Sequence, residues 1–284
     1  MKRAFLCLFI PLLMASTVIS QPAPQSADQI IKQMIQRTRE IRTMSYTMRK
    51  LERIDGKMTE QLAAVKLQRK PLKIYIRQKE PNDGMEILYV SGENNNKALV
   101  NPNGFPWVNV NLDPLGNLMR KNQHHTLLNS GYDLFVDILD GLMKKYHKEV
   151  KDFTSISKTT VFDGRSCWVI ELKNPYFKYE PYTVKAGETL ITIAEKFNLG
   201  EYQIMAKNDK IDSYDDVRAG QVIQIPNDYS PRMTLYIDQE RQLPLIMKVY
   251  DDKGLYEHYE YQSVVIDPVL PSDTFSEHNE AYGF

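Results

Sequence analysis

The sequence predicts an α+β protein in which a curved antiparallel sheet, packed with helices, carries a small inserted module of βααβ order. Three observations lead to this expectation. Short runs rich in β-branched and aromatic residues alternate with turn signals over most of the chain. Two other segments place their apolar residues at helical spacing. Prolines on both sides of an internal segment separate it from the sequence around it.

Residues 1–20 are predicted to form a secretory signal peptide. Two basic residues precede an apolar run that ends at Ile19, and cleavage is expected near Ser20. An uncleaved membrane anchor is the alternative, but Pro11 interrupts the run and no basic patch follows it. Cleavage would give a periplasmic protein without a transmembrane span, with Cys167 as its only cysteine.

Two amphipathic helices are expected in the larger part of the chain. The first covers residues 28–39, with Ser26 as its N-terminal cap and with Ile30, Ile31, Met34 and Ile35 on one face. The second lies within residues 130–148 and has a wide apolar stripe. The stripe consists of Leu134, Phe135, Ile138, Leu139, Leu142, Met143 and Tyr146. This helix is expected to lie on the sheet.

The strands are expected to form an antiparallel meander. Turn dipeptides such as Asp55-Gly56 and Asp163-Gly164 supply residues that tolerate positive φ in hairpins. Alternation predicts that each strand presents one face to a core. Leu72, Ile74 and Ile76 alternate with Lys73, Tyr75 and Arg77, and Trp168, Ile170 and Leu172 alternate with Cys167, Val169 and Glu171.

The internal segment contains a short strand, two helices and a closing strand. Tyr182-Thr-Val begins it, a helix follows from Thr189 to Phe197, and a second helix runs from Glu201 to about Asn208. The closing strand ends before Pro226. With Tyr-Thr-Val-Lys-Ala-Gly-Glu-Thr-Leu at the start and Gly-Gln-Val-Ile-Gln-Ile-Pro at the end, the segment closely resembles a LysM module over 182–226.

The LysM resemblance implies binding of N-acetylglucosamine-containing peptidoglycan in a shallow groove between two loops. Exposed amides and short polar side chains in such loops can bond acetamido and hydroxyl groups. The residues implied are Gly187, Glu188, Thr189, Leu190, Asn208, Lys210 and Ile211. Glu188 stands where the family more often has aspartate, and Ile191 where an aromatic or polar residue is common. Turn geometry for Gly187 and helix capping for Thr189 are the alternative roles.

The rest of the chain, residues 21–181 and 227–284, resembles the LolA-like periplasmic lipoprotein-carrier fold. The resemblance rests on Asp238-Gln-Glu-Arg-Gln-Leu-Pro-Leu-Ile-Met-Lys-Val-Tyr and on Val269-Leu-Pro-Ser-Asp-Thr-Phe. It implies a half-barrel with an apolar cavity for acyl chains, although a closed dry core is also possible. Candidate cavity residues are those that the alternation of a strand or the apolar stripe of a helix places on one face. They are Leu72, Ile74, Ile76, Trp107, Phe135, Leu139, Met143 and Trp168.

No catalytic, metal or cofactor site is predicted. Cys167 lies in the middle of a strand and is expected to be a sheltered thiol. The adjacent His124-His125 pair cannot place both rings on one face of a helix or strand. The acidic residues on the second helix are Asp133, Asp137 and Asp140. They lie in its N-terminal half, where carboxylates interact favourably with the helix dipole, and they are expected to form a solvated face.

The sequence therefore predicts an exported, non-enzymatic binding protein. The expected partners are peptidoglycan glycan strands and a lipid, an acylated ligand or a partner protein. Lysine plus arginine and aspartate plus glutamate both number 36, and the absence of a basic block argues against nucleic acid. A cell-wall scaffold without an apolar ligand and an accessory of a cell-wall hydrolase are the alternatives.

Overall fold

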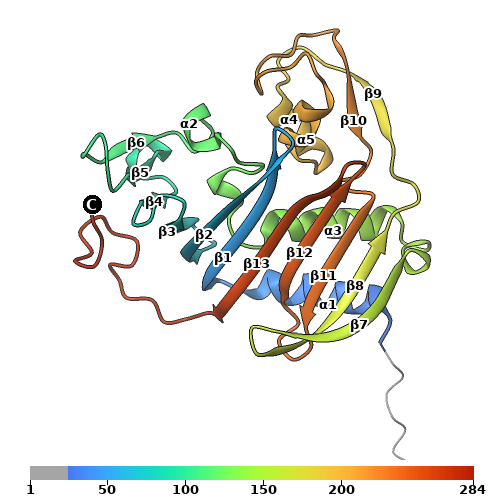
Figure 1. Cartoon of the computed structure of the whole chain (residues 1–284), viewed down its shortest axis with the longest axis horizontal. Helices are drawn as coiled ribbons and strands as arrows, with labels where there is room; N and C mark the ends of the chain where they lie inside the picture. The colour runs from blue at the N-terminus through green and yellow to red at the C-terminus, as the bar shows by residue number, and fades with distance from the viewer. Residues whose placement is uncertain (1–24) are drawn as a thin grey trace, which may run out of the picture.

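The computed structural model describes residues 25–284, so the predicted signal peptide lies outside the described residues. Within them, eleven strands form one antiparallel sheet in the order β6-β5-β4-β3-β2-β1-β13-β12-β11-β8-β7. The sheet is curved and open, with β6 and β7 as its edges (Figure 1). The strands are β1 Thr43–Ile54, β2 Lys57–Gln68, β3 Lys73–Glu80, β4 Glu86–Val90, β5 Ala98–Asn101, β6 Val110–Leu112, β7 Thr154–Phe162, β8 Arg165–Lys173, β11 Arg232–Asp238, β12 Pro244–Asp251 and β13 Gly254–Ile266. The predicted α+β class is confirmed.

Two long helices lie across one face of the sheet (Figure 1). They are α1 (Ala27–Glu40) and α3 (Asp133–Lys145), and both bury their apolar stripes in the main core. The side chain of Gln29 accepts a hydrogen bond from the Ser26 N–H at 3.1 Å, as expected for the start of α1. A short helix, α2 (Asn117–Arg120), lies in the connection that leads to α3.

The sequence predicted that the acidic residues of α3 form a solvated face, but in the structure they also form ion pairs. Asp133 pairs with Arg69, and the Arg39 guanidinium of α1 lies 3.2 Å from Asp137 and 2.7 Å from Asp140. The sequence could not indicate these pairs, because they join segments that are far apart along the chain. The carboxylates therefore help to hold α3 against α1 and the sheet.

The inserted module folds around a core of its own. It contains β9 (Tyr179–Thr183), α4 (Leu190–Phe197), α5 (Glu201–Lys207) and β10 (Val222–Pro226). Its buried residues include Leu190, Ile193, Ile204 and Ile223. The first strand starts before the predicted Tyr182, since Tyr179 already pairs with Pro226.

The module stands in the place of a hairpin loop. Strand β8 pairs with β11 from Lys173 opposite Arg232 to Cys167 opposite Asp238. The Asn174 N–H donates to the carbonyl of Pro231 at 2.8 Å, which closes the gap between the two strands. The sheet therefore continues across the insertion, and the module projects from one end of it (Figure 1).

At Ile74 and Tyr75 strand β3 is buried on both of its faces, which differs from the one-sided burial that its alternation predicts. Ile74 is 0% exposed on one face, and Tyr75 is only 5% exposed on the other. The C-terminal segment covers this second face, where Tyr282 stacks on Tyr75 with 3.7 Å between ring centroids.

In residues 25–284, no helix is long and apolar enough to cross a membrane.

Candidate functional site

A cavity of about 450 Å³ lies under the face of the sheet that α3 covers. Its walls come from β1 to β6, β12, β13, α3 and the segment from α2 to α3. Most of the lining is apolar, which suits an apolar ligand. The apolar lining residues include Met48, Ala63, Val65, Ile76, Met85, Ile87, Val100, Leu112, Leu118, Met119, Leu127, Leu134, Phe135 and Met247.

Two of the predicted cavity residues, Ile76 and Phe135, line this cavity. Ile74 and Leu139 share their elements but are both 0% exposed within the packed core. The period of a strand or helix selects one face, and it does not distinguish a wall residue from a core residue on that face. Some lining residues that the sequence missed, such as Met85, lie outside regular elements, whereas others, such as Val65 and Ile87, lie in strands.

The other four predicted residues do not line the cavity. Leu72 and Trp168 are partly buried against the core. Met143 faces a different groove, between α1 and α3. Trp107 is 79% exposed in the loop between β5 and β6, with a φ of 63°, so no strand alternation applies to it.

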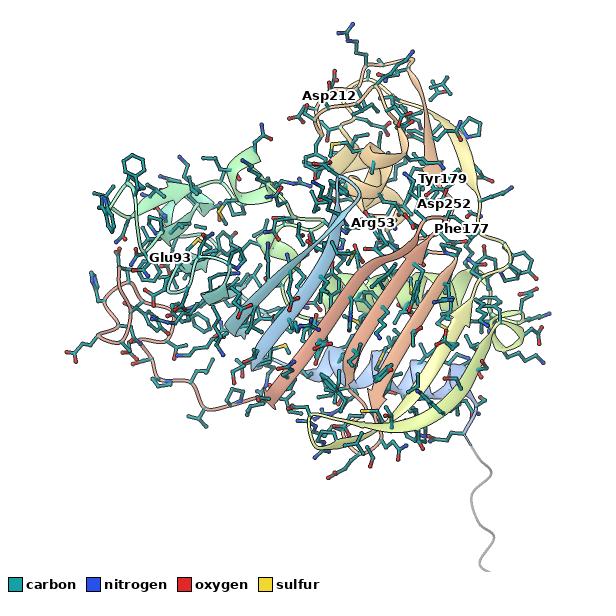
Figure 2. The ribbon with its side chains drawn as sticks, in the orientation of Figure 1. Arg53, Glu93, Phe177, Tyr179, Asp212 and Asp252 are labelled. Carbon is teal, nitrogen blue, oxygen red and sulfur yellow. The ribbon has the colours of Figure 1, made fainter. Side chains whose placement is uncertain are left out.

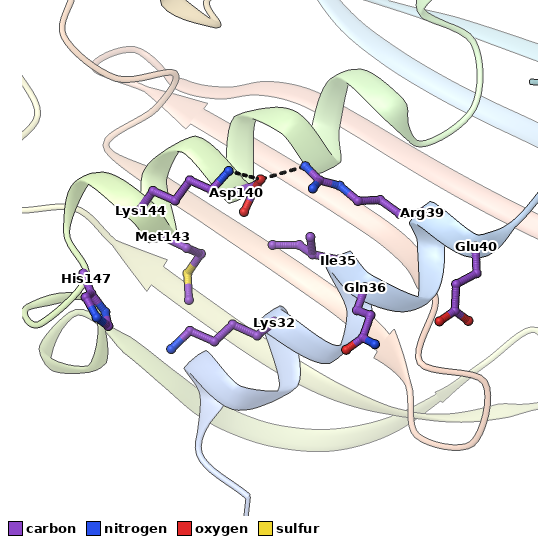
Figure 3. Close-up of a pocket in the computed structure, with 9 residues that line it drawn as sticks. All are labelled: Lys32, Ile35, Gln36, Arg39, Glu40, Asp140, Met143, Lys144 and His147. Carbon is purple, nitrogen blue, oxygen red and sulfur yellow. Dashed lines mark hydrogen bonds and ion pairs between the residues drawn. The ribbon is translucent and has the colours of Figure 1, made fainter.

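The groove between α1 and α3 is open to solvent and has mixed lining (Figure 3). Ile35 and Met143 form an apolar floor between charged side chains. The Asp140 carboxylate accepts from Arg39 at 2.7 Å and from Lys144 at 2.8 Å, as the dashed lines in Figure 3 mark. Because these charges already neutralise one another, the cavity beneath the sheet is the stronger candidate site.

One end of the cavity is polar. Lys50, Glu52, Gln123 and His125 all line it. Glu52 is 1% exposed and accepts from the Tyr259 hydroxyl at 2.6 Å, while its other oxygen lies 3.3 Å from the Lys50 ammonium. Lys50 also contacts the Gln123 side-chain oxygen. Such a buried carboxylate requires several donors, and these residues provide them.

Behind this end, two histidines share one carboxylate. His124 Nδ1 lies 2.8 Å from Glu257 Oε1, and its Nε2 lies 3.0 Å from the carbonyl of Arg53. His125 Nε2 lies 3.1 Å from the same Glu257 oxygen. The Tyr229 hydroxyl completes the group, at 2.9 Å from both Glu257 oxygens. Adjacent residues point to opposite faces only in a regular element, whereas both histidines lie in a loop.

The cluster shifts the pKa values of its members in opposite directions. Burial alone would raise the pKa of Glu257, but the charges and hydrogen bonds of His125 and His124 outweigh it and hold the pKa well below its usual value. Burial alone would lower the pKa of His125, yet the Glu257 carboxylate raises it above its usual value. The protonated His125 and the ionised Glu257 therefore stabilise each other.

The inserted module is bonded to the rim of the cavity. Arg120 of α2 is buried, pairs with Glu201 of α5, and lies 3.8 Å from the centroid of the Tyr214 ring. The neighbouring Leu118 and Met119 line the cavity. One short helix therefore contacts the cavity through two residues and the module through a third.

Further contacts fix the module at the tip of the β1–β2 hairpin. The Tyr202 hydroxyl accepts from the Asp55 N–H at 2.9 Å, and the Tyr202 ring stacks on His124 with 4.7 Å between centroids. Lys207 lies 3.3 Å from Asp252 and 4.0 Å from the Tyr179 ring centroid; both partners are labelled in Figure 2. These contacts leave the module little freedom relative to the sheet.

The first predicted glycan loop combines exposed backbone with internal bonds. Gly187 is exposed with a φ of 80°, and nothing lies within 4 Å of a Cβ built there. Glu188 accepts from the Lys185 N–H at 2.9 Å and from the Tyr182 hydroxyl at 2.8 Å. Thr189 caps α4, and Leu190 is 0% exposed in the module core.

The second predicted glycan loop follows α5. Asn208 donates to the carbonyls of Ile204 at 2.7 Å and Gln224 at 2.9 Å, and its Oδ1 accepts from the Gln224 N–H at 2.9 Å. Ile211 is 5% exposed, whereas Lys210 is exposed. Gly187 and Lys210 are thus the predicted residues most available to a ligand, and several of the others support the fold.

Neither a metal site nor a reactive thiol is apparent in the described part of the chain. Residues 25–284 contain no group of three or more histidine, cysteine or acidic side chains that could hold a metal ion. Cys167 is 0% exposed, and burial raises its thiol pKa to about 11. A thiol with such a pKa is almost wholly protonated at neutral pH and is a poor nucleophile.

Several solved structures are similar to this chain at low sequence identity. A DUF1329 family protein from Desulfovibrio piger is 9% identical with a TM-score of 0.34, and the match covers 88% of this chain and 96% of the D. piger protein. Lipoprotein LppX from Mycobacterium tuberculosis is 14% identical with a TM-score of 0.39, covering 86% and 97%. A LolA superfamily protein from Nitrosomonas europaea is 10% identical with a TM-score of 0.32, covering 89% and 99%.

Two family models match segments of the chain. No curated protein matches it. Residues 182–226 match the LysM domain model, so the predicted LysM module is confirmed. Residues 41–192 match the family described as protein of unknown function (DUF1571). Because this match extends over more than half of the 284 residues, the chain belongs to the DUF1571 family.

Proposed function

We propose that this chain is an exported, non-enzymatic binding protein that holds an apolar ligand close to the cell wall. In this proposal the LysM module binds N-acetylglucosamine-containing glycan of peptidoglycan. The cavity under the sheet takes a lipid or an acylated ligand. The observation that carries the proposal is the apolar cavity, whose rim helix α2 is bonded to the LysM module through Arg120 and Glu201.

The glycan half of the proposal is supported by the accessible part of the two loops. Gly187 and Lys210 are exposed, and Glu188, Thr189 and Asn208 are partly exposed. Flexible loops would lose conformational freedom on binding, but these loops are already ordered by internal hydrogen bonds. A single module of this kind would bind weakly, so binding to a polymer such as the sacculus would benefit from many equivalent sites.

The apolar half of the proposal is favoured over the scaffold alternative by the open cavity. A scaffold has no need for a large apolar cavity, because each cavity in a core reduces stability. The lining brings together Met48, Met85, Met119 and Met247, and methionine side chains adapt readily to ligands of irregular shape. Periplasmic location follows from the predicted signal peptide and from the wall ligand.

Sedimentation with purified sacculi tests the glycan half. We expect the mature protein to pellet with sacculi and to be released by soluble N-acetylglucosamine oligomers. Lys210→Glu should weaken pelleting, because it places a carboxylate in the proposed groove, whereas Lys148→Glu makes the same change on an exposed host segment and should not. Equal pelleting of both variants, without competition by the oligomers, would contradict the glycan assignment.

Native mass spectrometry tests the apolar half. The mature protein, purified from the exported compartment without detergent, should carry a lipid or acylated peptide. Ile76→Trp fills part of the cavity and should reduce the bound mass, with circular dichroism as the check on folding. An empty wild-type protein that still binds sacculi would favour the scaffold alternative.

A further inference from the structure

More basic than acidic side chains line the polar end of the cavity. Three basic side chains line the cavity, namely Lys50, Lys121 and His125, and Glu52 is the only acidic one. Glu52 is already engaged by the Tyr259 hydroxyl at 2.6 Å, the His124 N–H at 3.1 Å and Lys50 at 3.3 Å. Its charge is therefore compensated by Lys50, and Glu257 balances His125 from behind the cavity wall, so Lys121 is the cation left to face a ligand.

Two of these groups have nitrogen atoms without a partner among residues 25–284. Lys121 is exposed at the cavity lining and makes no hydrogen bond or ion pair with a described side chain. His125 Nδ1 is buried without a hydrogen-bond partner, while Nε2 of the same ring faces Glu257 and Tyr229. Buried polar atoms are normally paired, and this nitrogen has less than 1 Å² of exposed surface, so it lies just behind the cavity wall and not at its surface.

Glu257 favours the protonated form of His125. The carboxylate lies 3.1 Å from Nε2 and raises the pKa of the ring, although burial alone would lower it. The other groups around the ring are Glu52, Glu201, His124, Tyr229 and Tyr259. In the protonated ring Nδ1 carries a hydrogen, so the atom without a partner is a charged donor.

The volume of the cavity limits the apolar part of the ligand. A methylene group occupies roughly as much space as a water molecule in the liquid, ~30 Å³. The cavity of about 450 Å³ therefore has room for about fifteen methylene groups. That is the size of one long acyl chain.

From this arrangement we propose that the cavity takes an amphiphile with one long acyl chain and an anionic head, a carboxylate or a phosphate. The chain lies among the apolar residues near Ile76 and Phe135. The head accepts a hydrogen bond from Lys121, and the charges of Lys50 and of the His125 ring attract it. This inference rests on the proposed apolar-ligand function and makes it more specific, since it names the charge and the number of chains.

Calorimetric titration of the delipidated, full-length mature protein tests this inference. The probes are palmitate, 1-palmitoyl lysophosphatidate, methyl palmitate and hexadecyltrimethylammonium, each below its micellar concentration. We expect palmitate or the lysophosphatidate to bind about tenfold or more tightly than methyl palmitate, because charge-assisted hydrogen bonds are made only by the anions. Comparing these two anions distinguishes a carboxylate from a phosphate head.

Variants locate the head group. Lys121→Gln should reduce palmitate affinity several-fold and leave methyl palmitate binding unchanged, whereas Lys97→Gln, an exposed lysine outside the cavity, should change neither. His125→Gln, checked for folding by circular dichroism, should act in the same direction as Lys121→Gln. The His125 variant also alters the buried cluster around Glu257. The result for Lys121→Gln therefore decides whether the head group binds at this end of the cavity.

The possible outcomes separate the two levels of the argument. Equal affinity for palmitate and its methyl ester, or tightest binding of the cationic probe, would overturn the anionic head while leaving an apolar-ligand protein. Binding of none of the four probes would count against the proposed apolar-ligand function itself. Preference for palmitate that Lys121→Gln does not alter would place the head elsewhere and overturn the assigned site.

Discussion

The polar networks of the LysM module and of the surrounding host domain differ in how far apart along the chain their bonded residues lie. In the module, Thr189 bonds to Thr192, Glu188 to Lys185, and Asn208 to Ile204, all within a few positions. In the host domain, the Glu257 cluster joins residues that are more than 100 positions apart, such as His124 and Glu257. The module thus has a local sequence signature, whereas the host site exists only in the folded chain.

The difference affects which part of the chain can be assigned from sequence. A local network leaves a motif of fixed spacing, and that motif identified the module and nearly its exact limits. A network assembled from a loop, a linker and a distant strand leaves no spacing to recognise. The predictions below test whether the host cluster and the module are as different, and as closely joined, as the contacts indicate.

The largest effect is expected from removing the shared carboxylate of the host cluster. Glu257→Ala would leave two buried histidines without their acceptor, and breaking a buried ion pair in this way costs about 3–5 kcal/mol. Urea denaturation should show this loss in the free energy of unfolding. Glu257→Gln keeps the shape and should cost less, whereas a loss below about 1 kcal/mol for the alanine variant would mean that the cluster contributes little.

The next effect concerns the bond between the two regions. Arg120→Ala would leave Glu201 without its buried partner, with an expected cost of about 3 kcal/mol. Scanning calorimetry should then show the module melting apart from the host domain. The control is Lys207→Ala, which removes a more exposed pair across the same interface and should change stability by no more than about 1 kcal/mol. A single unchanged transition for Arg120→Ala would contradict the joining role of this pair.

A smaller effect is expected inside the module. Asn208→Ala removes three hydrogen bonds, one to Ile204 in α5 and two to Gln224 in β10, and it should reduce the stability of the module by about 1–3 kcal/mol. Lys210→Ala, on an exposed neighbouring position, is the matched control and should have almost no effect on unfolding. Equal stability of the two variants would show that Asn208 is not structural, and would favour its predicted role in glycan binding.

The pH dependence of the host cluster gives the smallest effect. The raised pKa of His125 means that its contribution is fully present below the unfolded value of about 6.5 and is lost as pH rises through the folded value. Glu257, with a lowered pKa, contributes above its unfolded value of about 4.5 and loses this contribution as pH falls through its folded value. The stability difference between wild type and His125→Gln should therefore shrink from pH 6 to pH 9 in chemical denaturation. A constant difference over this range would contradict the raised pKa.

Much of the fold could be predicted from local patterns. The spacing of Ile30, Ile31 and Met34 predicted α1, and the positive-φ turn at Asp55-Gly56 predicted the β1–β2 hairpin. The burial of Tyr75 could not be predicted, because the C-terminal segment that covers it is distant in sequence. Patterns of two or 3.6 residues describe one element at a time, and they contain no information on what packs against it.

Less of the candidate site could be predicted. Ile76 and Phe135 line the cavity, but Trp107 points to solvent from an irregular loop where no period applies. The polar end was not predicted, since Lys50, His125 and Glu257 come from three separate parts of the chain. The only sequence signal was the adjacent histidine pair, whose common acceptor lies on β13.

Photo-crosslinking with palmitate that carries a diazirine at its chain end tests the central claim most directly. After irradiation of the full-length protein, peptide mapping gives the residues that contact the chain. The account predicts crosslinks to cavity-lining segments, in β3 to β5 and at the start of α3 around Phe135. Crosslinks confined to the groove between α1 and α3, or to the LysM module, would contradict a ligand site beneath the sheet.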